Sequence, residues 1–172
     1  YPTVIIGEHE WMAKNLRVTK YRNGDFIQTS LTNFQWANFN QGAYAIYPHG
    51  QIEGIGSDGE VADSYGNLYN WYALTDQRGI CPEGWRAPSD TDWDQLESFL
   101  GGSSVAGGKL KSTRTDPDPH PRWNQPNEGA TDEFGFFAVP GGNRAGGSGS
   151  YILLGFYGVF WSSTEFDATS AR

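Results

Sequence analysis

Short apolar runs separated by turn residues make up the first part of the sequence. Residues 4–6 are apolar, and residues 10–12 follow a turn-like Gly-Glu pair, which predicts two strands joined by a tight turn. Residues 16–21 lead to Asn23-Gly24 and then to the apolar pair at 26–27. Because both residues of an Asn-Gly pair tolerate positive φ, a second hairpin is predicted there.

Two later stretches have the apolar spacing of one helix face. The first lies near residues 65–75, with apolar side chains at 65, 68, 71 and 72. The second, residues 89–100, begins with Ser89 as N-cap and has Asp92 at the capping-box position. These are the two principal helices of the prediction, and the apolar stripe of the second contains Trp93, Leu96, Phe99 and Leu100.

The C-terminal half alternates strand-like and loop-like segments after a short predicted helix at 105–110. Strands are predicted where aromatic and β-branched residues gather, at 134–140, 151–154 and 157–161. Long loops are predicted where polar, Pro and Gly residues gather, at 29–62, 113–129 and 141–149. Hairpins, then helices, then strands indicate an α+β fold with helices packed against a mostly antiparallel sheet.

Length and charge narrow the classes of function. The sequence has 172 residues and no linker, so residues 1–172 are predicted to form a single domain. Twenty acidic and 12 basic residues give a net charge of −8, which argues against nucleic acid as a partner. Aromatic residues make up 15% of the sequence, which suits either core packing or sugar stacking. No apolar run of about 18 residues is present, so no transmembrane segment is predicted.

Catalytic constellations are weak in the sequence. No Gly-x-Ser-x-Gly elbow accompanies the three His residues. Cys81 is the single cysteine, has no His near it in sequence, and is interpreted as a packed thiol. Asp132-Glu133, and Glu165 with Asp167, would serve a hydrolase only by converging across a cleft, and are otherwise surface charges or calcium ligands. We therefore predict that the protein is not an enzyme.

Seven short blocks in a fixed order resemble one bacterial family, the Fibrobacter succinogenes major paralogous domain family. The blocks span nearly the whole sequence and lie at residues 4–7 with 10–16, 65–71, 82–89, 107–112, 132–136, 140–144 and 161–165. Their aromatic members and the apolar stripes predict eight largely buried residues: Trp11, Leu68, Trp71, Trp85, Trp93, Leu96, Phe136 and Trp161.

The resemblance implies a C-type-lectin-like fold, with two principal helices packed on twisted, mostly antiparallel sheets with long loops. It also implies an extracellular or bacterial cell-surface location, often as an outer-membrane-attached lipoprotein. Gln125-Pro126-Asn127 is similar to the tripeptide with which C-type lectins hold calcium and sugar, although the Trp-Asn-Asp partner motif does not follow. Calcium is the one cofactor that this likeness suggests, with Gln125, Asn127 and Asp132 as its candidate ligands.

Family members usually continue past the block at 161–165, so the resemblance implies that residues 1–172 lack closing strands. The segment 151–161 contains no charge and no Pro, and an edge there offers free N–H and C=O groups. We expect this edge to be covered by a continuation of the polypeptide or by a partner strand. The candidate ligand-binding residues lie around it: Asn143, Arg144, Tyr151, Glu165 and Asp167.

Three functions remain open at this point. The first is a non-catalytic domain that binds a glycan or a surface protein, as in adhesion. The second is a structural or assembly subunit that a partner strand completes. The third is a carboxylate-dependent hydrolase, which requires two carboxylates about 5–10 Å apart in a cleft.

Overall fold

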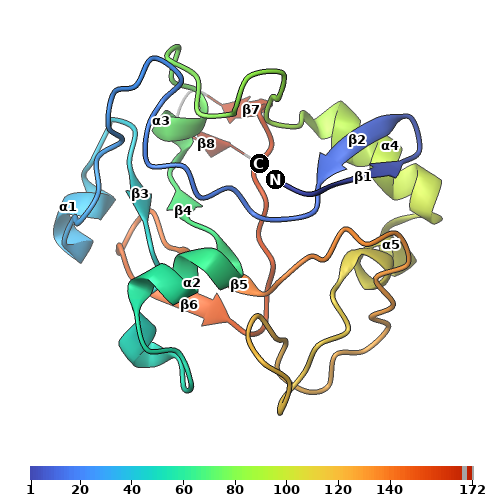
Figure 1. Cartoon of the computed structure of the whole chain (residues 1–172). Helices are drawn as coiled ribbons and strands as arrows, with labels where there is room; N and C mark the ends of the chain where they lie inside the picture. Colours follow the sequence, from blue (N-terminus) through green and yellow to red (C-terminus); the bar gives the residue numbers. More distant parts are fainter. Residues whose placement is uncertain (168–169, 172) are drawn as a thin grey trace.

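Short helices and strands joined by long ordered loops make up the computed structural model, which describes residues 1–167 and 170–171 (Figure 1). The helices are α1 (Asn33–Ala37), α2 (Asp58–Tyr65), α3 (Trp71–Leu74), α4 (Asp90–Leu100), α5 (Ser103–Leu110) and the 3-10 turn η1 (His49–Gln51). The strands pair antiparallel in twos: β1 (Thr3–Ile6) with β2 (His9–Met12), β3 (Tyr44–Ala45) with β4 (Leu68–Tyr69), β5 (Gly141–Arg144) with β6 (Tyr151–Leu154), and β7 (Glu165–Asp167) with β8 (Ser170–Ala171). The α+β class is confirmed, but the described strands join no larger sheet.

The first predicted hairpin is confirmed and the second is reduced to a turn. β1 and β2 pair along their whole length, and Gly7 adopts a φ of 62° between them. Gly24 also has positive φ, but only an isolated bridge between Lys20 and Phe26 joins the flanking segments. The Phe26 side chain is 75% exposed, whereas its neighbour Ile27 and Tyr21 on the other segment are each 3% exposed.

The predicted helix at 89–100 is confirmed as α4, and Ser89 is its N-cap as predicted. The Ser89 hydroxyl accepts the Asp92 N–H at 3.3 Å, and the Asp92 carboxylate accepts the Ser89 N–H at 2.6 Å. Gly101 ends the helix in the left-handed region. Phe99 is 55% exposed, so the buried stripe is narrower than predicted. In the described part of the protein, no helix has the length and apolar character needed to cross a bilayer.

The helix predicted near residues 65–75 is wrong. α2 ends at Tyr65, β4 follows, and the single turn of α3 begins after Asn70, whose side chain accepts the Ala73 N–H. Gly66 separates these elements, because its φ is 78° and a Cβ there would lie 2.5 Å from the Asn15 Cβ. The apolar spacing at 65, 68, 71 and 72 therefore comes from three elements and not from one helix face.

Two predicted strands near the C-terminus are wrong, and one predicted loop contains a strand. Residues 134–140 and 157–161 carry only isolated bridges, Lys111 with Ala138 and Gly142 with Gly158. The loop predicted at 141–149 instead contains β5, which pairs with the correctly predicted β6. Glycine composition concealed β5, since glycine is unfavourable in strands unless backbones approach closely. A Cβ on Gly142 would lie only 2.4 Å from the Ile152 carbonyl oxygen.

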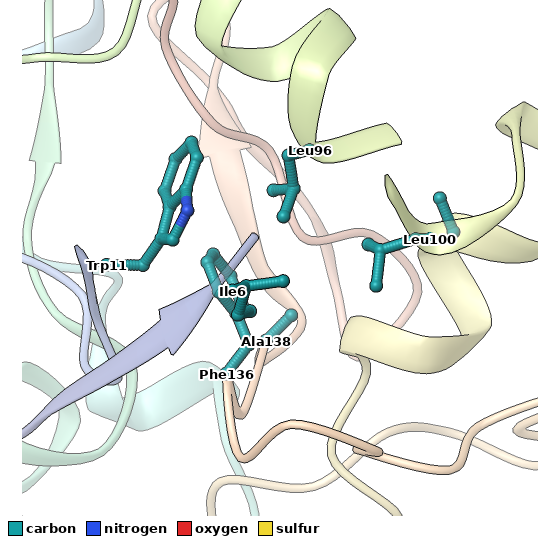
Figure 2. Close-up of a cluster of buried hydrophobic side chains, with 7 residues drawn as sticks. Ile6, Trp11, Leu96, Leu100, Phe136 and Ala138 are labelled. Carbon is teal, nitrogen blue, oxygen red and sulfur yellow. The ribbon is translucent and has the colours of Figure 1, made fainter. Parts of the chain in front are cut away.

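The main apolar cluster lies between the β1–β2 hairpin and α4 (Figure 2). Its buried members are Ile6, Trp11, Leu96, Leu100, Ala106, Phe136 and Ala138. Burial is thus confirmed for three of the eight predicted core positions: Trp11, Leu96 and Phe136. The other five are partly buried and not fully buried: Leu68, Trp71, Trp85, Trp93 and Trp161.

The segment between β6 and β7 connects the two sides of the fold. In Figure 1, β1, β2, α4 and α5 lie to one side, and α1, α2 and β3 lie to the other. Trp161, in this segment, donates its indole N–H to the Tyr69 carbonyl of β4 at 2.8 Å. Its own carbonyl accepts the indole N–H of Trp93 on α4 at 3.2 Å. These two bonds place the segment between α4 and β4.

Candidate functional site

A pocket of about 390 Å³ lies where this segment, α4 and the β1–β2 hairpin meet. Its wall carries rings from β2, from α4 and from three connecting segments, namely Trp11, Trp85, Trp93, Phe136, Phe160 and Trp161. Ligand sites in proteins typically occupy about 300–1,000 Å³ and combine apolar walls with a few placed polar groups. The pocket therefore has the size and the composition of a binding site.

Ring contacts and indole hydrogen bonds fix this aromatic wall. The ring centroids of Trp11 and Trp93 lie 5.0 Å apart, and the Trp93 and Trp161 indole N–H groups are both paired. Trp85, Trp93 and Trp161 are core residues in the sequence prediction, yet each is only partly buried. They line the pocket, which leaves part of each side chain open, and Trp93 also packs against the main apolar cluster.

Arg86 and Asp92 form an ion pair in the pocket wall. The Asp92 carboxylate accepts hydrogen bonds from both Arg86 Nη atoms, at 2.5 and 2.7 Å, and from the Ser89 N–H and hydroxyl, each at 2.6 Å. The Arg86 guanidinium, followed by the Ser89 donors, holds the pKa of Asp92 well below its usual range. Asp92 is only 7% exposed, and because the Arg86 and Ser89 donors outweigh the effect of burial on its pKa, the carboxylate is ionised at neutral pH.

Replacement of Asp92 by Asn is expected to lower the free energy of unfolding by about 2 kcal/mol at pH 7, because charge-assisted hydrogen bonds are lost. The folded pKa of Asp92 is below the unfolded value, so its stabilisation is complete above about pH 5 and is lost as pH falls toward the folded pKa. Urea unfolding at pH 7 and at about pH 2.5 should therefore show the difference shrinking in acid. The control is Asp94→Asn on the exposed face of α4, and a gap that stays constant with pH would contradict the assignment.

Two buried polar atoms of pocket-lining residues have no hydrogen-bond partner in the structure. They are the indole nitrogen of Trp11 and the side-chain oxygen of Asn67. Asn67 Nδ2 lies 3.5 Å from the Val18 carbonyl, which directs the amide nitrogen toward the protein. Both atoms are themselves shielded from solvent, as are four further unpartnered polar atoms, which belong to residues outside the pocket.

Three of the predicted ligand-binding residues lie on the β5–β6 hairpin, where Arg144 makes the side-chain contacts that hold it in place. Arg144 is 8% exposed and donates to the Leu31 and Gly149 carbonyls at 2.7 and 2.9 Å. The Tyr151 ring lies 4.7 Å from the Arg144 guanidinium, and the Asn143 side-chain oxygen is buried. None of these three residues lines the aromatic pocket.

The remaining predicted binding residues lie at the other end of this region. Glu165 is exposed at the start of β7. Asp167 ends β7, and its side chain is outside the described part of the structure. The structure does not bring Glu165 together with Arg144 and Tyr151 into one pocket.

The candidate calcium ligands each make an internal hydrogen bond. Gln125 Nε2 donates to the Asp116 carbonyl and Asn127 Nδ2 to the Ser112 carbonyl, each at 2.9 Å. Asp132 Oδ1 accepts the Phe137 N–H at 2.8 Å. Within residues 1–167 and 170–171, no group of three or more His, Cys, Asp and Glu residues is placed to hold a metal ion.

Two titratable groups of the pocket, Cys81 and His9, have internal surroundings that the structure describes. Burial raises the pKa of the Cys81 thiol, which keeps it protonated, and a protonated thiol is a poor nucleophile. His9 Nε2 is 2.7 Å from the Gln95 side-chain oxygen and lies 4.0 Å from Asp92. Outside the pocket, Glu133 pairs with Lys109 at 3.2 Å. His9 and Glu133 therefore each contact another side chain of the protein.

The sequence analysis predicts most residues of the aromatic wall as buried core residues, and it does not predict that they line a pocket. Its signal is the excess of Trp, seven in 172 residues, which suits core packing and ligand stacking equally well. Only the path of residues 155–164 across the fold brings Trp161 to Trp93 and Tyr69.

Comparison with known proteins identifies one family. A sequence model described as the Fibrobacter succinogenes major domain matches residues 4–172. No curated protein and no solved structure matches the sequence or the fold. The family match covers every residue of the aromatic wall, so the pocket lies within the region shared with the family.

Proposed function

The chain belongs to the Fibrobacter succinogenes major domain family, and we propose that it is a non-catalytic binding domain with a C-type-lectin-like fold. Its ligand is a glycan or a protein, and its place is outside the bacterial cell or on the cell surface. The location follows from the resemblance to surface-attached members of the family. The hydrogen bonds of Gln125 and Asn127 use their amide nitrogens, whereas calcium would bind amide oxygens, and the proposal does not depend on calcium.

The aromatic pocket is the observation that carries this proposal. Its wall carries rings held in place by ring contacts and indole hydrogen bonds, and its volume of about 390 Å³ suits a ligand. Tryptophan surfaces of this kind contribute large contact area with little loss of side-chain entropy on binding. Half-buried Trp85 is the lining residue best suited to a test, because no hydrogen bond of its side chain holds the described fold together.

The state of the polar groups supports binding over catalysis. Asp92 is held ionised by Arg86 and Ser89, and burial raises the pKa of the Cys81 thiol. A glycosidase needs one carboxylic acid that is protonated near its working pH, which requires a raised pKa. The Asp92 pKa is displaced in the opposite direction.

An assembly role is the second candidate, and the exposed strand β6 favours it. Among the described strands β6 pairs only with β5, and its Ile152 and Leu153 side chains are 40% and 42% exposed. A strand with exposed apolar side chains is a template for another strand. In this role the partner would add to the β5–β6 hairpin and not enter the aromatic pocket.

The binding proposal is tested by screening the folded 172-residue protein against a glycan array and a displayed library of random linear peptides. For the ligand selected, Trp85→Ala is expected to weaken binding at least about ten-fold, since a ring contact surface is lost. Phe34→Ala, at an exposed ring on α1 outside the pocket, should leave the affinity within about two-fold. Equal effects of the two variants would place binding elsewhere, and the absence of any ligand would reject the proposal.

A further inference from the structure

Beyond ligand binding, we infer that two copies of this protein associate through the uncharged apolar segment 152–160. This segment comprises most of β6, the turn that follows it, and the residues that lead to Trp161. The inference rests on the assembly role given above as the second candidate function, and it names the partner in that role as a second copy. It does not depend on which ligand enters the aromatic pocket.

Exposed apolar side chains are concentrated in this segment. Six of the 13 large apolar residues that are exposed in the described part of the protein lie within these nine positions, and the other seven are scattered singly along the sequence. The six are 37–62% exposed: Ile152, Leu153, Phe156, Tyr157, Val159 and Phe160. A single exposed apolar residue is ordinary, whereas a group of them marks an interaction surface.

The backbone holds this surface in one conformation. The N–H groups of Phe156 and Tyr157 both donate to the Leu153 carbonyl at 3.1 Å, which closes a tight turn around Gly155 at a φ of 83°. The Gly155 carbonyl accepts the Asn124 N–H at 2.8 Å, which joins the turn to the neighbouring loop. A surface that is already ordered loses little conformational entropy when it binds a partner.

The size of this surface is enough for a weak dimer. With about 150–250 Å² for a whole aromatic side chain and somewhat less for an aliphatic one, the six residues expose on the order of 500 Å². Two copies in contact would therefore bury about 1,000 Å², which is the lower limit for a specific interface. A dissociation constant on the order of 10–100 µM is expected, because an interface of this size only narrowly outweighs the entropy cost of association.

The absence of charge favours a second copy as the partner. In a symmetric dimer the same patch supplies both sides of the contact, so charges in the patch would face charges of the same sign. The protein has a net charge of −8, yet residues 151–161 contain no Asp, Glu, Lys, Arg or His. The exposed face of α4, which carries Asp94 and Glu97, would instead repel itself. The segment therefore allows self-contact on a protein whose acidic surface otherwise opposes it.

Sedimentation equilibrium of the 172-residue protein at about 5–500 µM tests the inference, with a reversible monomer–dimer equilibrium as the expected result. Phe156→Glu, at a ring that is 62% exposed, should weaken the dimer about ten-fold or more, because a carboxylate from each copy enters a contact that excludes water. Phe34→Glu is the matched control. Its ring on α1 is 79% exposed and lies outside the segment, so the dissociation constant should stay within about two-fold.

Salt dependence separates this interface from an ionic one. Raising the ionic strength from about 0.05 to 0.5 M screens the repulsion between two acidic copies, and should strengthen the dimer about three-fold or more. A dimer that weakens in salt would be held by ion pairs elsewhere on the surface and would contradict the inference.

Three further results would overturn the inference. They are a protein that stays monomeric over the whole concentration range, equal effects of Phe156→Glu and Phe34→Glu, and Phe156-dependent binding of the monomer to neutral phosphatidylcholine vesicles, which would make the segment a lipid-contact surface. Trp85→Ala, in the pocket but outside the segment, should leave the dimer unchanged. A monomer that binds a ligand would reject association and leave the binding proposal intact, and a dimer without a ligand would do the reverse.

Discussion

Replacement of Arg144 by Leu is expected to lower the free energy of unfolding by about 3–5 kcal/mol. Arg144 is 8% exposed, and its guanidinium donates to the Gly149 and Leu31 carbonyls at 2.9 and 2.7 Å. It also lies over the Trp36 and Tyr151 rings, at 4.4 and 4.7 Å from their centroids. Leucine keeps part of the packing but leaves two carbonyl oxygens without their donor.

The loss should be seen as a lower urea midpoint at pH 7, followed by tryptophan fluorescence. Arg114→Leu provides the matched control, because Arg114 is exposed and only faces the Phe137 ring at 5.3 Å. That variant should cost less than about 1 kcal/mol. If Arg144→Leu were as mild as Arg114→Leu, the guanidinium would have no structural role, and its predicted place in a ligand-binding face would regain support.

Sequence reasoning succeeds where one short stretch contains all the information. The cap of α4 is set by Ser89 and Asp92, and its end is set by Gly101. The β1–β2 hairpin is set in the same way by an apolar run, a Gly at positive φ and a second apolar run. Such signals act within about one turn of backbone and do not depend on distant contacts.

Sequence reasoning fails where distant backbone contacts decide the structure. The glycine content of β5 predicts a loop, because nothing in residues 141–144 reveals how closely β6 approaches. The pattern across 65–75 predicts one helix, because a glycine in the sequence does not by itself reveal a positive φ. The positive φ of Gly66 accompanies a close approach of the backbone to Asn15. Tertiary context overrides local propensity at both places.

The candidate site escapes sequence reasoning for a related reason. The local sequence around a Trp does not tell whether the side chain is fully buried or lines a pocket, because this depends on the three-dimensional arrangement. Trp85, Trp93 and Trp161 come from three different segments, and Trp161 lies far from the other two in sequence. The predicted face around Arg144 rests on the resemblance and on an expected sheet edge. Arg144 is instead turned toward Leu31 and Gly149, where its charge is used within the fold.

Replacement of Leu100 by Ala is expected to lower the free energy of unfolding by about 3–5 kcal/mol. Leu100 is 1% exposed and packs with Ile6, Leu96 and Phe136 in the main apolar cluster, as Figure 2 shows. Truncation removes most of the side group and leaves a cavity that α4 cannot close, because Gly101 and α5 fix its C-terminal end. Thermal and urea unfolding of the same variant measure the loss.

Phe99→Ala is the control for this prediction, since it deletes a larger side group from the adjacent position on α4. Phe99 is 55% exposed and its ring contacts that of Phe134, so its removal should cost only about 1 kcal/mol. A larger loss for Phe99→Ala than for Leu100→Ala would mean that α4 is rotated relative to the β1–β2 hairpin. Such a rotation would also move Trp93, and the aromatic pocket would have to be redrawn. Because Leu100 does not line that pocket, folded Leu100→Ala should bind the selected ligand with unchanged affinity, which separates loss of stability from loss of the site.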